Sequence, residues 1–127
     1  QKNLGSILAK KGQTDEAIYH LQKALEIDPS YSDAHDHLGN VLLKIGRTNE
    51  ALFRLQKALE IDPNKISTLK NLAIAYVRSG QLTNAIPLVE KALALAKAAG
   101  NESMIREITV NLDQLIKMSH SVQHSPR

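Results

Sequence analysis

The sequence predicts an all-α chain made of three helix-turn-helix repeats followed by a C-terminal capping helix. Three observations lead to this fold class. The chain resembles itself when 35–65 is placed on 1–31. Its apolar residues recur with the 3.6-residue period of a helix, and no segment alternates as a β-strand does. With 127 residues, 43% of them hydrophobic, the chain is expected to form one domain with its own core.

The internal repeat is strongest between the first two copies. In the alignment of 1–31 with 35–65, 17 of 31 positions are identical. The segment 21–29 recurs unchanged as 55–63. A third copy at 69–99 is weaker but stays in phase at Leu72, Gly80 and Ala85. A fixed period of this length is typical of stacked repeat proteins.

Each repeat is expected to contain two helices. A glycine in left-handed conformation ends each first helix, and a threonine caps the start of the second helix in two repeats. An Asp-Pro pair ends the second helix, because the residue before proline is disfavoured in the α region. These residues are Gly12, Gly46 and Gly80, Thr14 and Thr48, Asp28-Pro29 and Asp62-Pro63. The expected helices span 1–11, 15–27, 32–45, 49–61, 66–79, 83–99 and 102–118.

The third repeat passes into a different last helix. Pro87 falls near the start of its helix, where a proline costs at most about one backbone hydrogen bond. Gly100 is expected to end that helix, and Asn101 to cap the next one. The last helix carries one apolar stripe and is expected to cover the end of the array, while 119–127 forms a flexible tail. The stripe consists of Ile105, Ile108, Leu112, Leu115 and Ile116.

Several repeated positions hold the same residue, or a similarly small one, in each repeat. They are Leu4-Gly5, Leu38-Gly39 and Leu72-Ala73, then Ala17, Ala51 and Ala85, Ala24, Ala58 and Ala92, and Pro29 and Pro63. With these residues the unit resembles the tetratricopeptide repeat over about 1–99. The resemblance implies a right-handed α-solenoid, a single domain over 1–118 with repeats at about 1–31, 32–65 and 66–99. It also implies that the first helices line a concave groove for extended peptides.

Catalytic and metal sites are not expected. The chain has no cysteine, which excludes disulfides and thiolate ligands and weakly favours a reducing compartment such as the cytoplasm. His35 and His37 point about 200° apart on a helix, so they do not chelate one metal. His120 and His124 have a ligand-like spacing but fall in the expected tail. No cofactor is expected, and we expect the chain not to be an enzyme.

Nucleic-acid and membrane partners are not expected either. The net charge of +3 comes from interspersed basic and acidic residues, with four aromatic residues in all, and offers no basic stripe with stacking rings. The longest apolar run, 72–77, is far shorter than the roughly 18 residues of a membrane span. The expected partner is therefore a protein or a peptide.

The repeat geometry implied by the resemblance places candidate peptide-binding residues in columns of equivalent positions. Asn3, His37 and Asn71 form one column, Lys10, Lys44 and Arg78 another, and neighbouring columns add Asn40 and Lys70. The first column is similar to part of the asparagine ladder of O-linked N-acetylglucosamine transferase, whose amides hold a peptide main chain. The basic column suggests a partner with acidic residues. Both columns also fit a structural role, as amides bonded to a neighbouring helix or water and as cations at helix ends.

Three functions follow from this reading of the sequence. The first is a non-catalytic interaction module or scaffold that binds an extended peptide or partner segment in its concave groove. The alternative is self-association or stacking within a longer repeat protein, because Gln1 already lies in a helical pattern and leaves that end of the array uncapped. The third is the substrate-selecting arm of a glycosyltransferase-like enzyme. The family's clamp for chaperone tails is not expected, since only Lys2 matches it.

Overall fold

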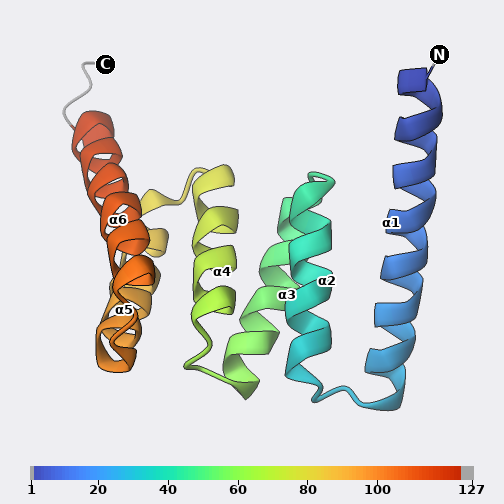
Figure 1. Cartoon of the computed structure of the whole chain (residues 1–127), viewed down its shortest axis with the longest axis horizontal. Helices are drawn as coiled ribbons and strands as arrows, with labels where there is room; N and C mark the ends of the chain where they lie inside the picture. The colour runs from blue at the N-terminus through green and yellow to red at the C-terminus, as the bar shows by residue number, and fades with distance from the viewer. Residues whose placement is uncertain (1, 124–127) are drawn as a thin grey trace. The chain divides into compact units, whose positions relative to one another are not determined.

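The computed structural model describes residues 2–123 of the chain, with side chains described over 10–121. Over this part the chain is all-α and contains no strand (Figure 1). The helices are α1 (Lys2–Ile27), α2 (Ser32–Lys44), α3 (Thr48–Ile61), α4 (Ile66–Arg78), α5 (Leu82–Ala99) and α6 (Glu102–Gln123). The all-α array of repeat units expected from the sequence is therefore confirmed.

The chain divides into two compact units, and the single domain expected over 1–118 stays a prediction. The first unit spans 1–61 and contains α1, α2 and α3. The second unit spans 62–127 and contains α4, α5 and α6. The boundary falls at the Asp62-Pro63 pair, where the sequence ends a helix and the backbone turns.

In the first unit, α2 and α3 form the helix-turn-helix that the repeat predicts. Gly46 follows α2 with a φ of +84°, in the left-handed region that glycine adopts without a Cβ penalty. The two helices approach very closely at Gly39, where an added Cβ would lie 2.5 Å from Leu55 Cγ. Leu55 is fully buried, and so are Ala51 and Ala58 on the same face of α3. Small residues in the repeat thus allow close helix packing.

The first repeat does not contain the expected turn. Gly12 lies inside the continuous helix α1, so the predicted break between 1–11 and 15–27 is wrong, as is an N-cap at Thr14. A glycine inside a helix costs only about 1 kcal/mol relative to alanine, so it permits a helix to continue. The described residues of α1 pack against α2 and not against α3. Within the described part of the first repeat, a turn at Gly12 would therefore gain no stabilisation from a packed helical hairpin.

The predicted N-cap at Thr48 is also wrong, because Thr48 is already the first residue of α3. The preceding Arg47 holds Glu50 instead, with hydrogen bonds from Nε and Nη2 of 2.8 and 2.6 Å to its two carboxylate oxygens. This hydrogen bonding raises the pKa of the Arg47 guanidinium. The Asp-Pro stops are confirmed, since α1 ends at Ile27 and α3 at Ile61.

In the second unit, α5 packs against both α4 and α6. Gly80 and Gly100 adopt φ of +78° and +69° after α4 and α5, as expected. The Asn101 side chain accepts a 3.1 Å hydrogen bond from the Met104 backbone N–H and so caps α6. The last helix reaches Gln123 rather than ending at Met118. The buried apolar side chains are Leu69, Leu72, Ala73, Ala75, Ala85, Val89, Ala92, Ala96, Ile108 and Leu115.

Candidate functional site

A groove in the second unit lies between α4 and α6 and encloses a cavity of about 320 Å³. Its floor is apolar, with buried Ala73, Val89 and Ile108. Ile74 from α4 and Met118 from α6 are 43% and 44% exposed, so each offers apolar surface to solvent within the groove. The complete lining is Lys70, Ala73, Ile74, Val77, Arg78, Val89, Ile108, Asn111, Gln114, Leu115 and Met118.

The charged groups of this groove are both basic and both come from α4. Lys70 and Arg78 are eight residues apart, which is about 12 Å along a helix. The Lys70 Nζ lies 2.9 Å from Glu107 Oε1, and these side chains are 27% and 58% exposed. Asn111 and Gln114 add amides from α6, and an amide can pair with both polar groups of a peptide unit. The lining contains no acidic residue, but the Glu107 carboxylate pairs with Lys70.

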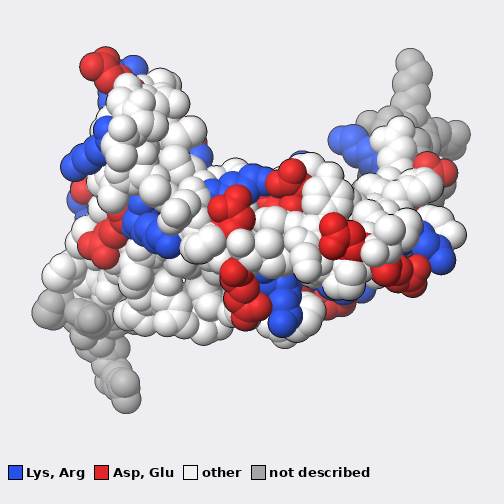
Figure 2. All heavy atoms as spheres, turned by 90° about the horizontal axis from the view of Figure 1, so that it is seen from below, with Lys and Arg blue, Asp and Glu red and all other residues white. Residues whose placement is uncertain are grey.

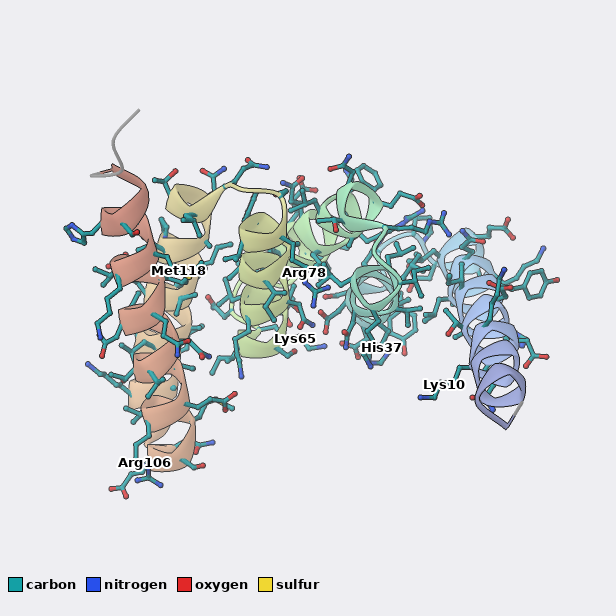
Figure 3. All side chains as sticks on the ribbon, turned by 90° about the horizontal axis from the view of Figure 1, so that it is seen from above. Lys10, His37, Lys65, Arg78, Arg106 and Met118 are labelled. Atoms are coloured by element: carbon teal, nitrogen blue, oxygen red, sulfur yellow. The ribbon has the colours of Figure 1, made fainter. Side chains whose placement is uncertain are left out.

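The basic residues predicted to share a column belong to both units, and each unit is described by itself. Lys10 and Lys44 both line a hollow of about 860 Å³ between α1 and α2 in the first unit. Lys10 projects from α1 in Figure 3, and Arg78 lies on α4 of the second unit, where it lines the groove already described. Asp15 also lines the first hollow, which therefore carries both charges. On the face shown in Figure 2, acidic and basic side chains are likewise interspersed.

The predicted asparagine column stays a prediction. The Asn3 side chain lies outside the described residues. His37 is exposed on α2 and Asn71 is half-buried on α4, so the two belong to different units. Asn40 is half-buried on α2. His37, Asn40 and Asn71 line neither of the two hollows described above.

The residues that α6 contributes to the groove are not among the site residues predicted from the sequence. Met118, Asn111 and Gln114 lie on a helix that was interpreted only as a cap. The period itself carried the signal, because Ile108 follows Ile74 by one full repeat spacing. The last helix thus occupies the phase of a further first helix, although it lacks the Leu-Gly pair.

The described part of the chain contains no group of three or more His, Cys, Asp or Glu residues placed to hold a metal ion. His35 is buried, and its Nε2 donates a 2.9 Å hydrogen bond to the Pro29 carbonyl, which ties α2 to the turn before it. None of the helices, within the described residues, is long and apolar enough to cross a membrane.

Comparison with protein families places most of the chain in one family. A model described as TPR repeat matches residues 5–46 and 39–80, and one described as tetratricopeptide repeat matches 68–103. These matches overlap and together run from residue 5 to residue 103. No curated protein sequence matches the chain significantly.

Solved structures of low sequence identity share the fold. PcrH in complex with the chaperone binding region of PopD is 21% identical, with a TM-score of 0.78 over 93% of this chain and 90% of that one. The TPR2B domain of yeast Sti1 in its pHsp70 complex is 20% identical, with a TM-score of 0.76 over 90% and 91%. The first TPR of Spaghetti (RPAP3) bound to the HSP90 peptide SRMEEVD is 19% identical, with a TM-score of 0.77 over 94% and 90%.

Proposed function

The chain belongs to the tetratricopeptide repeat family, and on this basis we propose that it binds a segment of a partner protein in the groove between α4 and α6. The family consists mainly of non-catalytic interaction modules, which supports a role in binding rather than in catalysis. The single observation that carries the proposal is the apolar groove of about 320 Å³ with Ile74 and Met118 exposed in it.

The chemistry of the groove defines the class of segment. Burying one aliphatic side chain of the partner against the apolar floor contributes about 1.5–3 kcal/mol. Each hydrogen bond from Asn111 or Gln114 to the main chain of the segment adds a net of about 0.5–1.5 kcal/mol. A carboxylate beside the aliphatic anchor would compete with Glu107, which pairs with Lys70 at 2.9 Å, and would lie near the charge of Arg78. Salt weakens these interactions because the groove is open to solvent.

The solved structures of similar fold support a protein segment as the ligand. PcrH is seen with a binding region of PopD, the Sti1 domain with pHsp70, and the Spaghetti repeat with an HSP90 peptide. Each of these domains holds part of another protein, and each has low identity to this chain. The sequence of the segment that this chain binds is therefore to be determined by selection.

The proposal is tested by selecting peptides from an unbiased display library on the unmodified chain and on two variants. Ile74→Glu places a charge in the groove, while Val110→Glu places the same charge on α6 at a residue that is 55% exposed and does not line the groove. We expect Ile74→Glu to lose the enriched peptides and Val110→Glu to keep them. Circular dichroism and thermal melting show whether both variants remain folded. Enrichment that survives Ile74→Glu in the folded variant contradicts the proposed site.

The two predicted columns are tested in the same selection. An Asn3→Ala, His37→Ala, Asn71→Ala variant that loses binding while folded supports the asparagine column. Charge reversal of Lys10, Lys44 and Arg78 is expected to deplete acidic residues from the selected peptides. Peptide sets that are unchanged in both variants remove the columns from the binding surface.

A further inference from the structure

One acidic residue lies at the edge of the groove between α4 and α6 without lining it. Glu107 is in the first half of α6, and its Oε1 accepts a 2.9 Å hydrogen bond from the Nζ of Lys70, which does line the groove. The bond joins two ionised groups, and hydrogen bonds of this kind are shorter and stronger than neutral ones. The pair therefore links the two walls of the groove at one end.

Helix geometry places the Glu107 carboxylate on the groove side of α6. Asn111 and Gln114 line the groove and follow Glu107 by four and seven residues, which keeps all three on one face of a helix. One and two repeat spacings earlier, the equivalent positions hold the small uncharged residues Ala73 and Gly39. The carboxylate is therefore a feature of the last helix and not of the repeat.

The pair changes what this end of the groove offers to a ligand. Lys70 alone would attract a carboxylate of the bound segment, because an ammonium group has three N–H donors and no acceptor. With Glu107 already 2.9 Å from the ammonium, an incoming carboxylate meets a positive and a negative group at similar distances, so attraction and repulsion largely cancel. Glu107 is also the more exposed of the two side chains, so its charge is the more accessible one to an arriving segment.

We infer that Glu107 is a specificity-determining residue, which neutralises Lys70 and makes the groove favour a segment with an uncharged residue at this end over one with a carboxylate. The inference rests on the proposed binding of a segment between α4 and α6, and it narrows the class of that segment. Arg78 lies about 12 Å further along α4, which exceeds the screening length of about 8 Å at physiological salt. The discrimination is therefore confined to the Lys70 end.

The test begins with a peptide display library in which Glu and Gln are equally frequent at every position. It is selected on the unmodified chain, on Glu107→Gln and on the control variant Asp113→Asn. Asp113 is exposed, does not line the groove and follows Asn111 by two residues, which places it about 200° around α6 from that residue. We expect one peptide position at which Glu becomes enriched over Gln on Glu107→Gln and on neither of the other proteins.

Two synthetic peptides that differ only by Glu or Gln at that position then measure the discrimination. On Glu107→Gln, the Glu peptide is expected to bind about two- to five-fold more tightly than the Gln peptide, which is the range for an exposed ion pair. This advantage is expected to disappear in about 1 M salt. The unmodified chain is expected to bind both peptides with equal affinity, and so is the double variant Lys70→Gln, Glu107→Gln.

Three outcomes overturn the inference, and each has a different meaning. An unchanged ratio of Glu to Gln in peptides selected on Glu107→Gln removes Glu107 from specificity and leaves the groove in place. Equal weakening of both peptides by Glu107→Gln means that the pair only holds α4 and α6 together. If selection yields no peptide that depends on the groove, as judged with Ile74→Glu, the proposed function is refuted and this inference with it. Thermal melting shows whether each variant is folded.

Discussion

Gly12 and Gly46 provide the sharpest test of the fold, because they occupy the same position in two repeats and adopt different conformations. Gly12 lies within α1, and an added Cβ there meets nothing within 4 Å. Gly46 has a φ of +84°, also with open space around it. The same change to alanine therefore alters only the backbone free energy at each site.

The expected effects have opposite signs. Alanine at position 12 raises the free energy of unfolding by about 0.8–1 kcal/mol, the difference in helix propensity from glycine. Alanine at position 46 lowers the free energy of unfolding by about 1–2 kcal/mol, the cost of a Cβ in left-handed conformation. The two variants are thus expected to differ by about 2–3 kcal/mol.

Urea unfolding followed by circular dichroism, at one protein concentration, measures this difference. With a slope of about 1–3 kcal/mol per molar urea, the midpoint of Gly12→Ala rises and that of Gly46→Ala falls, each by about 0.5 M. The unmodified chain is the common reference. If Gly12→Ala lowers the midpoint as Gly46→Ala does, Gly12 adopts a turn in solution and the continuous α1 is refuted.

Two further substitutions test packing and capping. Gly39→Ala is expected to lower the free energy of unfolding by about 0–2 kcal/mol, because overpacking against Leu55 costs about 1–3 kcal/mol and the propensity gain offsets about 1 kcal/mol. Higher stability in urea, as the propensity gain alone would give, means that α2 and α3 are less closely packed. Asn101→Ala is expected to cost about 1 kcal/mol, since Met104 N–H loses its acceptor. Asn111→Ala, at an exposed position inside α6, is the control, and an equal loss in both variants rejects the cap.

The second and third repeats could be predicted well because their signals are local. A left-handed glycine after α2 and α4, and the Asp-Pro pair after α3, act through the backbone alone. The first repeat could not be predicted well, although more than half of its positions are identical to those of the second repeat. The same Gly12-to-Thr14 segment is compatible with a turn or a straight helix, and packing of the adjoining helices decides between them.

The groove was only partly predictable. Its α4 side follows from the resemblance to tetratricopeptide repeats, whose groove positions put Lys70 and Arg78 among the candidates. Its α6 side depends on how α5 positions α6 against α4, which is a matter of three-dimensional packing. Met118 could therefore be assigned to the groove from the structure but not from the sequence.

The central claim, that a partner segment binds between α4 and α6, is tested most directly by NMR of the two methionine methyl groups. Met118 lines the groove, whereas Met104 lies on the same helix and does not line it. Addition of a selected peptide to methyl-labelled protein is expected to shift the Met118 resonance and leave that of Met104 in place. A peptide that binds while the Met118 signal stays unchanged contradicts the account.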